Sequence, residues 1–176
     1  MSYKKASKPV IKFLFIILFM YTLIYGAIFS LRIILAVDSP IVVVEGISMI
    51  PTYYDGDLLV IKGVTDKGTI EAFRDIVVFH SPADWNTLIV HRVISCSFTN
   101  DIWYFRTKGD NNSIPDGIIS ENNIVGVVIW RIPTIGGIIL FTQSPIGRAI
   151  LIIIIGVIVM DMFYNRDDKS FIKEKE

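Results

Sequence analysis

A charge-free apolar run near the N-terminus constrains the fold of this chain more than any other feature. No residue from Phe13 to Leu31 is charged, and as a helix this run would be roughly 28 Å long, close to the hydrocarbon thickness of a bilayer. Because no face of the run is polar, a helix in a soluble core is disfavoured. The run therefore predicts a transmembrane signal anchor over residues 13–37. Residues 1–12 hold four lysines and no acid, so we expect them in the cytoplasm and the chain beyond the anchor outside.

A cleaved signal peptide is the alternative to a retained anchor. Its apolar region would be ~7–15 residues long and would be followed by a small-residue cleavage site. The run here is longer, and Arg32 interrupts the sequence directly after it. These two features favour an anchor that stays in the membrane.

A second apolar stretch covers residues 145–164. The part from Ala149 to Met160 is uncharged, but a full span requires Arg148 to snorkel at one end and Asp161 to lie at the other. Basic residues in 165–176 suit a charged cytoplasmic tail. We therefore expect a C-terminal transmembrane helix over 145–164 and a multi-pass protein of the cell membrane, with an interfacial or re-entrant helix as the alternative.

Residues 38–144, between the two apolar stretches, are expected to form an extracytoplasmic β domain. Short runs rich in Val, Ile and Phe are each bounded by Gly, Pro, Asp or Asn, which is typical of strands and turns. No convincing helical pattern separates them. The pattern predicts a mostly β fold, a partly closed antiparallel domain. The expected strands are 41–44, 58–62, 76–79, 88–95, 102–107 and 124–132.

Composition narrows the class of protein. Hydrophobic residues make up 52% of the chain, a surplus that membrane segments account for. The 17 basic and 17 acidic residues cancel, so nothing in the overall charge favours nucleic acid as a partner. The single cysteine, Cys96, excludes an internal disulfide and is expected to be a small filler at a strand end.

Ser48 follows the first expected strand, within the segment VEGISMIPT of residues 44–52. Gly46 permits a positive φ and Pro51 fixes φ, so Ser48 is expected on a stiff turn. A hydroxyl held rigidly at a strand end can serve as a nucleophile if a base lies beside it. An ordinary Gly/Ser/Pro turn is the alternative.

The chain offers two histidines as a base, His80 and His91. A histidine suits this role because its ordinary pKa lies near 6.5. His80 is expected at a surface turn. His91 shares a strand face with Ile89 and Val93, so it is expected to be buried and to need a partner. It is either a core histidine bonded to backbone or the base for Ser48.

Two aspartates, Asp110 and Asp116, lie in the segment 109–117, whose composition is that of a turn. Either carboxylate can orient an imidazole and stabilise the imidazolium. The segment superficially resembles a calcium loop, but Ile114 and Pro115 occupy places where an oxygen ligand and a glycine are needed. No metal or other cofactor is therefore expected.

Four segments, in order, resemble the sequence boxes of type I signal peptidases. They are SMIPT with the following Gly-Asp (48–57), RDIVVF (74–79), VHRVI (90–94) and TKGDNN (107–112) with Asp116 beyond. His91 stands where the bacterial enzymes of this family carry a lysine base. The resemblance therefore places the chain in the histidine-containing branch typical of archaea, the endoplasmic reticulum and some sporulating Gram-positive bacteria.

The resemblance implies a role for each candidate residue. Ser48 would be the nucleophile, His91 the general base and acid, Asp116 the residue that orients His91, and Asp110 a supporting acid. The Ser48 N–H is a natural donor to the oxyanion. Many family members carry a serine two residues before the nucleophile that assists, but Gly46 stands here, which leaves the second donor open.

The expected function is that of a membrane-anchored serine endopeptidase that removes signal peptides from exported preproteins. Its partners would be signal peptides, the lipid bilayer and the protein translocation machinery. A non-catalytic β module, acting as accessory subunit of a processing complex, is the alternative, although the full Ser48, His91 and Asp116 set argues against it. A self-cleaving regulatory peptidase is disfavoured, because the chain has an anchor and no room for a DNA-binding module.

Overall fold

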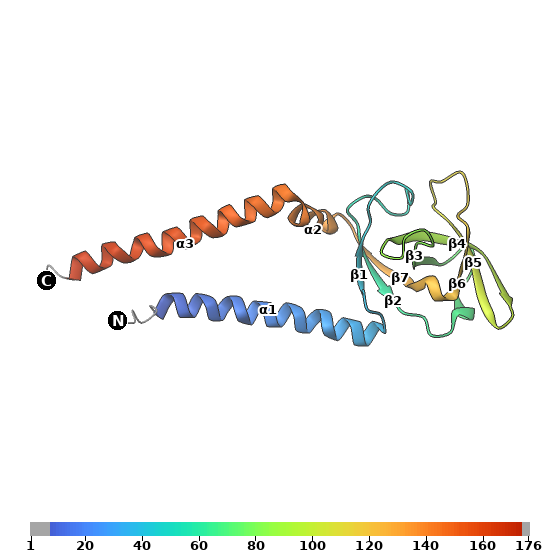
Figure 1. Cartoon of the computed structure of the whole chain (residues 1–176), viewed down its shortest axis with the longest axis horizontal. Coiled ribbons are helices and arrows are strands. Elements are labelled where there is room, and N and C mark those ends of the chain that lie inside the picture. Colours follow the sequence, from blue (N-terminus) through green and yellow to red (C-terminus); the bar gives the residue numbers. More distant parts are fainter. Residues whose placement is uncertain (1–7, 174–176) are drawn as a thin grey trace. The chain divides into compact units, whose positions relative to one another are not determined.

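The computed structural model describes residues 8–173 (Figure 1). The chain divides into a β unit, residues 28–140, and a helical unit that combines 1–27 with 141–176. The predicted segment 1–12 lies mostly outside the described residues, as does the end of the predicted tail 165–176.

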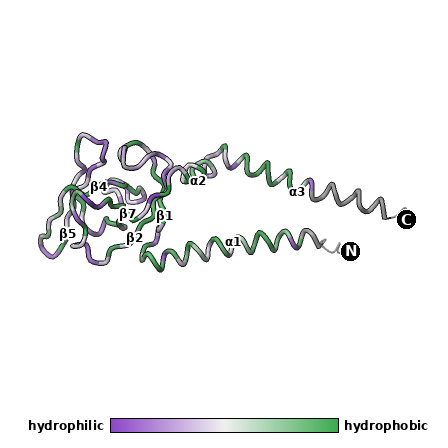
Figure 2. Tube along the Cα trace, turned by 180° about the vertical axis from the view of Figure 1, so that it is seen from behind, coloured by the Kyte–Doolittle hydropathy of each residue, from purple (hydrophilic) through white to green (hydrophobic). Residues whose placement is uncertain are grey.

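Helix α1 (Lys8–Leu35) contains the predicted apolar run. Of the described helices, it is the one long and apolar enough to cross a membrane by itself, over Ile11–Leu35. Most side chains from Ile11 to Leu35 are exposed, and the helix is hydrophobic over most of its described length (Figure 2). The helix ends against the β unit, where the Gly63 N–H donates to Leu35 O at 2.8 Å. The prediction of an N-terminal apolar helix is confirmed.

Within residues 8–173, seven strands form one antiparallel sheet in the order β1-β2-β7-β3-β4-β5-β6 (Figure 1). The sheet curls into a half-barrel, so the predicted antiparallel β domain is confirmed. Six strands match the predicted runs, with ends shifted by a few residues, and β6 was not predicted. The strands are β1 Ile41–Val43, β2 Leu58–Lys62, β3 Ile76–His80, β4 Leu88–Thr99, β5 Ile102–Lys108, β6 Ile118–Ser120 and β7 Ile124–Ile132.

The core lies along the middle of the sheet. β3 is buried over nearly its whole length because β4 and β7 flank it on both sides. Each fully buried aliphatic or aromatic side chain contributes about 1.5–3 kcal/mol through removal from water. The buried cluster consists of Ile70, Val77, Phe79, Val93, Phe105, Ile119 and Ile124. This cluster fixes the sheet from which the site residues project.

Strand β4 has two halves with different neighbours. Residues 88–92 pair with β3, whereas pairing with β5 begins only at Arg92 and continues to Thr99. The edge of residues 88–91 that faces away from β3 therefore has no strand partner among the described residues. β1 is an outer strand and also has one unpaired edge.

The C-terminal region differs from its prediction. Helix α2 (Ile135–Gln143) was not predicted, and α3 (Pro145–Lys173) is longer than the expected 145–164. These helices are long and apolar enough for a span only if α2 and α3 are taken together as one broken helix. A second transmembrane helix over 145–164 therefore stays a prediction. Two 3-10 turns, Lys67–Thr69 and Glu121–Asn123, complete the described elements.

Candidate active site

Ser48 lies in the loop that connects β1 and β2. The loop is closed at its base, where the Val44 N–H donates to Asp57 O at 2.8 Å and the Gly56 N–H donates to Val44 O at 2.9 Å. Gly46 and Gly56 have φ of 96° and 81°, conformations that other residues adopt only at a cost. Met49 is 1% exposed and anchors the turn in the sheet. These contacts hold the Ser48 hydroxyl at the rim of the domain.

The imidazole of His91 lies between Ser48 and Asp116. His91 Nε2 is 3.1 Å from Ser48 Oγ, and His91 Nδ1 is 2.6 Å from Asp116 Oδ2. His91 is 7% exposed, so the predicted burial is correct. With the proton on Nδ1, the ring donates to the carboxylate and Nε2 is free to accept from the hydroxyl.

Asp116 is held by the strand that precedes its loop. The hydroxyl of Thr107, which is fully buried, donates to Asp116 Oδ2 at 2.7 Å. The Asp116 N–H donates to Thr107 O at 2.9 Å. Because Asp116 Oδ2 accepts from both Thr107 and His91, the carboxylate has a fixed orientation toward the ring.

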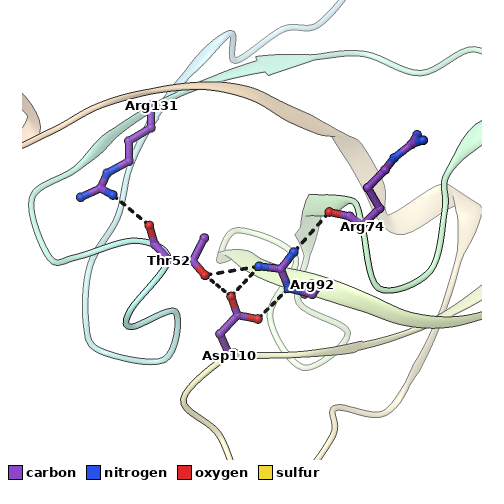
Figure 3. Close-up of polar contacts among 5 residues, drawn as sticks. All are labelled: Thr52, Arg74, Arg92, Asp110 and Arg131. Carbon is purple, nitrogen blue, oxygen red and sulfur yellow. Dashed lines mark hydrogen bonds and ion pairs between the residues drawn. The ribbon is translucent and has the colours of Figure 1, made fainter.

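Asp110 faces a different partner from Asp116. Arg92 donates from Nε to Asp110 Oδ1 at 2.8 Å and from Nη2 to Asp110 Oδ2 at 2.7 Å, and the Thr52 hydroxyl also donates to this carboxylate (Figure 3). Among the described contacts, Asp110 has no hydrogen bond to His91. The Arg92 guanidinium, followed by the Thr52 hydroxyl, lowers the pKa of Asp110 below its ordinary value.

Arg92 and Thr52 were not identified as site residues from the sequence. Arg92 follows His91 on β4 and therefore points to the opposite side of the strand. It also donates from Nη1 to Arg74 O at 3.2 Å (Figure 3). The ion pair of Arg92 with Asp110 could have been predicted from one sequence feature: an arginine directly after the candidate base, upstream of a loop with two aspartates.

A second network that the sequence did not reveal lies behind the Ser48 loop. Asp57 is fully buried, and its Oδ2 lies 2.7 Å from Arg131 Nε. Arg131 also donates from Nη1 to Thr52 O at 3.0 Å (Figure 3). Thr52 is thus contacted by guanidinium groups from both β4 and β7.

A groove of about 680 Å³ opens beside Ser48 and His91. One wall is the segment 42–45 from β1 onward, and the other is the segment 86–91 that leads into β4. Met49 and Asn112 also line it. The unpaired edges of β1 and of residues 88–91 belong to these two walls, so the groove is suited to an extended peptide.

His80 differs from its prediction. It is the last residue of β3 rather than part of a surface turn. Its ring stacks on Trp85 with centroids 4.4 Å apart, and its Nδ1 lies 2.6 Å from Trp85 O. Of the two histidines, only His91 contacts Ser48 in the described part of the chain. Over the same residues, no group of three or more His, Cys, Asp or Glu side chains is placed to hold a metal ion.

The Ser48 hydroxyl contacts the His91 imidazole, which contacts the Asp116 carboxylate, beside a groove suited to a peptide. This arrangement is that of the serine peptidases. Comparison with known proteins agrees with this class. The family described as "Signal peptidase, peptidase S26" matches residues 10–97, a range that includes Ser48 and His91. The chain belongs to this family, and it is a signal peptidase, a serine endopeptidase.

Individual relatives point to the same family. The chain is 32% identical over 148 residues to "Signal peptidase complex catalytic subunit sec11" of Schizosaccharomyces pombe, covering 70% of this chain and 78% of the relative. It is 33% identical over 133 residues to the protein of the same name from Dictyostelium discoideum, covering 70% and 72%. "Signal peptidase I W" of Bacillus subtilis is 33% identical over 78 residues, 44% of this chain and 40% of that protein. The predicted resemblance to the endoplasmic-reticulum-like branch is confirmed.

Proposed function

We propose that the chain is a membrane-bound endopeptidase that cleaves signal peptides from exported preproteins with a Ser48–His91–Asp116 site. The observation that carries this proposal is the line of contacts from Ser48 Oγ to His91 Nε2 at 3.1 Å and from His91 Nδ1 to Asp116 Oδ2 at 2.6 Å. A serine hydroxyl is a weak nucleophile until an adjacent base takes its proton. His91 is the base in reach of it.

In this mechanism, Ser48 Oγ attacks the scissile carbonyl carbon while its proton passes to His91 Nε2. Asp116 stabilises the imidazolium that forms and keeps the ring in the productive tautomer. His91 Nε2 then gives the proton to the leaving amine, which departs as the mature N-terminus. A water molecule, deprotonated by His91, hydrolyses the acyl-enzyme and releases the signal peptide. Asp110 supports the site through Arg92 and Thr52 rather than by contact with the ring.

The oxyanion that develops on the carbonyl needs donors. The Ser48 N–H is one, since among the described contacts it donates to no other group. Gly46 has no hydroxyl to offer as a second donor.

The substrate binds in the groove as an extended strand. Backbone groups of β1 and of residues 88–91 provide hydrogen bonds that are independent of side chains. Val44 and Met49 are buried and line the groove beside Ser48. The family resemblance implies small residues at the first and third positions before the scissile bond.

The membrane holds the enzyme where its substrates emerge. Residues 13–37 are the anchor, 38–144 the extracytoplasmic peptidase domain, and 145–164 a second membrane helix, with 1–12 and 165–176 in the cytoplasm. The relatives are named as catalytic subunits of a signal peptidase complex, which supports signal peptides as substrates. The lipid bilayer and the protein translocation machinery are the further partners of this proposal. A non-catalytic accessory module is not favoured, because Ser48, His91 and Asp116 are all present and in contact.

The catalytic assignment is tested with the full-length chain purified in detergent and a labelled preprotein, across pH. The parent is compared with Ser48→Ala, His91→Ala and His91→Lys, and His80→Ala is the matched control. We expect cleavage by the parent and by His80→Ala, and loss of cleavage in Ser48→Ala and His91→Ala at every pH. Cleavage by His91→Ala at the parent's rate rules out His91 as the base.

The topology is tested separately by cysteine labelling in intact cells. Cys96 was expected to be a filler at a strand end, but it is exposed within β4, so it serves as the extracytoplasmic reporter in the parent. A Cys96→Ser chain with a new cysteine at Ser170 reports on the tail. Labelling of residue 96 but not of residue 170 by an impermeant maleimide supports two spans, whereas labelling of both leaves only the N-terminal anchor.

A further inference from the structure

Two arginines from different strands contact Thr52. One of them, Arg92, lies on β4 beside His91. Arg92 of β4 and its partner Asp110 contact the Thr52 hydroxyl. Arg131 of β7 donates to the Thr52 carbonyl oxygen at 3.0 Å from the other side (Figure 3). The mechanism above gives Arg131 no role.

Arg131 is itself fixed at two further points. Its Nε lies 2.7 Å from Oδ2 of the fully buried Asp57, and its guanidinium carbon lies 5.5 Å from the centre of the Tyr54 ring. Asp57 in turn accepts from the N–H groups of Tyr54, at 2.7 Å, and Thr134, at 3.2 Å. The two backbone donors fix the Asp57 carboxylate, and the Arg131 Nε lies against it as an ion pair.

The contacts of Arg131 all end in the loop that carries Ser48. Thr52 and Tyr54 belong to that loop, and Asp57 closes its base through Val44. The turn between Ser48 and Thr52 is tight, because the Tyr53 N–H donates to Met49 O at 2.9 Å. A shift of the Thr52 carbonyl therefore moves the Ser48 hydroxyl relative to the imidazole. Displacements of about 1 Å at a catalytic group can cost on the order of a hundredfold in rate.

We infer that Arg131 is a positioning residue for Ser48: its bond to the Thr52 carbonyl, made possible by the ion pair with Asp57, sets the place of the nucleophile. Among the described contacts, Arg131 contacts neither Ser48 nor His91. The inference deepens the proposed function and rests on Ser48 being the nucleophile. It predicts that the loss of Arg131 lowers kcat and leaves KM nearly unchanged.

Two substitutions separate positioning from stability. Arg131→Met removes every donor, whereas Arg131→Lys keeps a charge for Asp57 but cannot hold Asp57 and Thr52 together as a planar guanidinium does. Ile70→Ala is the matched control, because Ile70 is 3% exposed in the core cluster and makes no contact of the Arg131 network. The full-length variants are assayed in detergent, well below the Tm of each, with a labelled preprotein. Hydrogen exchange is measured over residues 47–56 and over β3.

We expect Arg131→Met to lower kcat at least tenfold with KM within twofold, and to speed exchange over 47–56 but not over β3. Arg131→Lys should lie between parent and Arg131→Met in kcat while its Tm stays close to that of the parent. Ile70→Ala should lower Tm with kcat within twofold. The inference is overturned if Arg131→Met keeps kcat within twofold of the parent, if Ile70→Ala loses as much kcat, or if exchange over 47–56 is unchanged. Cleavage by Ser48→Ala would defeat the proposed function instead, and the exchange measurement would still decide whether Arg131 holds the loop.

Discussion

Replacing Arg92 by Met should destabilise the β unit by an amount that depends on pH. The change removes two charge-assisted hydrogen bonds from Asp110 and leaves its carboxylate with the Thr52 hydroxyl. Breaking a fully buried pair costs about 3–5 kcal/mol, and exposed pairs contribute ~0–1 kcal/mol. The side chains of Arg92 and Asp110 are 24% and 15% exposed, so we expect a loss of about 2 kcal/mol at neutral pH. For a domain of this size that lowers Tm by roughly 10 °C.

The pH dependence follows from the direction of the pKa shift. The pKa of Asp110 is lowered in the folded state, chiefly by Arg92, so the pair stabilises the fold above the ordinary aspartate pKa of about 3.9. This stabilisation is lost as pH falls through the lower, folded-state pKa. The gap in Tm between parent and Arg92→Met should therefore be widest near neutrality and close in strong acid.

Thermal unfolding in detergent, followed by tryptophan fluorescence over a series of pH values, measures this gap. Arg92→Met combined with Asp110→Asn is the control, because the second change removes the unpaired charge and should restore part of the lost stability. A gap below 2 °C at neutral pH, or a gap that stays constant into strong acid, would refute the reasoning.

Other predictions concern single contacts. Asp116→Asn should reduce kcat by as much as about 10,000-fold, as expected when the base loses its orienting carboxylate, with little change in Tm; a reduction below tenfold in the preprotein assay would contradict this. Thr107→Val, which removes the 2.7 Å bond to Asp116, should cost about 1 kcal/mol in chemical denaturation. His80→Ala should leave kcat unchanged and alter the fluorescence of Trp85, on which His80 stacks. A chain ending at residue 144 should remain in membranes after carbonate extraction, since α1 alone is long enough to span; its release would disprove the anchor.

Much of the fold could be predicted because its elements carry local patterns. Helix α1 is apolar on every face, and six strands are Val/Ile-rich runs between turn residues. β6 (Ile118–Ser120) has three residues, too few for a period-2 pattern. It is a strand because it pairs with β5, a contact that its own sequence does not predict. α2 begins just after Pro133 and contains two glycines, which are signals for a loop rather than a helix.

The residues of the candidate site could likewise be predicted only in part. Gly46 and Pro51 made Ser48 a candidate, and a buried strand face made His91 one, but the choice of these roles over an ordinary turn and a core histidine rested on the family resemblance. The preference for Asp116 over Asp110 came from resemblance to a family, since both residues lie in one turn of similar composition. Arg131 could not be found at all, because it acts on Thr52, 79 residues away in the chain. A local sequence pattern does not predict a contact between residues so far apart in the chain.

The order of the strands explains why such distant polar contacts matter. The Ser48 loop lies between β1 and β2, in the half β1-β2-β7, whereas His91 is on β4 and Asp116 follows β5, in the half β3-β4-β5-β6. Among the described strands, the two halves pair through β3 and β7, with a register shift between Val78 and Phe79.

Because Ser48 lies in a loop and not on a strand, sheet pairing alone does not set the distance between nucleophile and base. Bonds that cross between the halves must set it, and the described residues provide them at the Ser48 loop: the Asn111 N–H donates to Ser48 O at 2.8 Å, and Asp110 and Arg92 bind the Thr52 hydroxyl. Arg131 fixes the same Thr52 to its own half. Thr52 is thus the point at which both halves of the sheet are joined beside the nucleophile, and its environment should control activity more strongly than its distance from the scissile bond suggests.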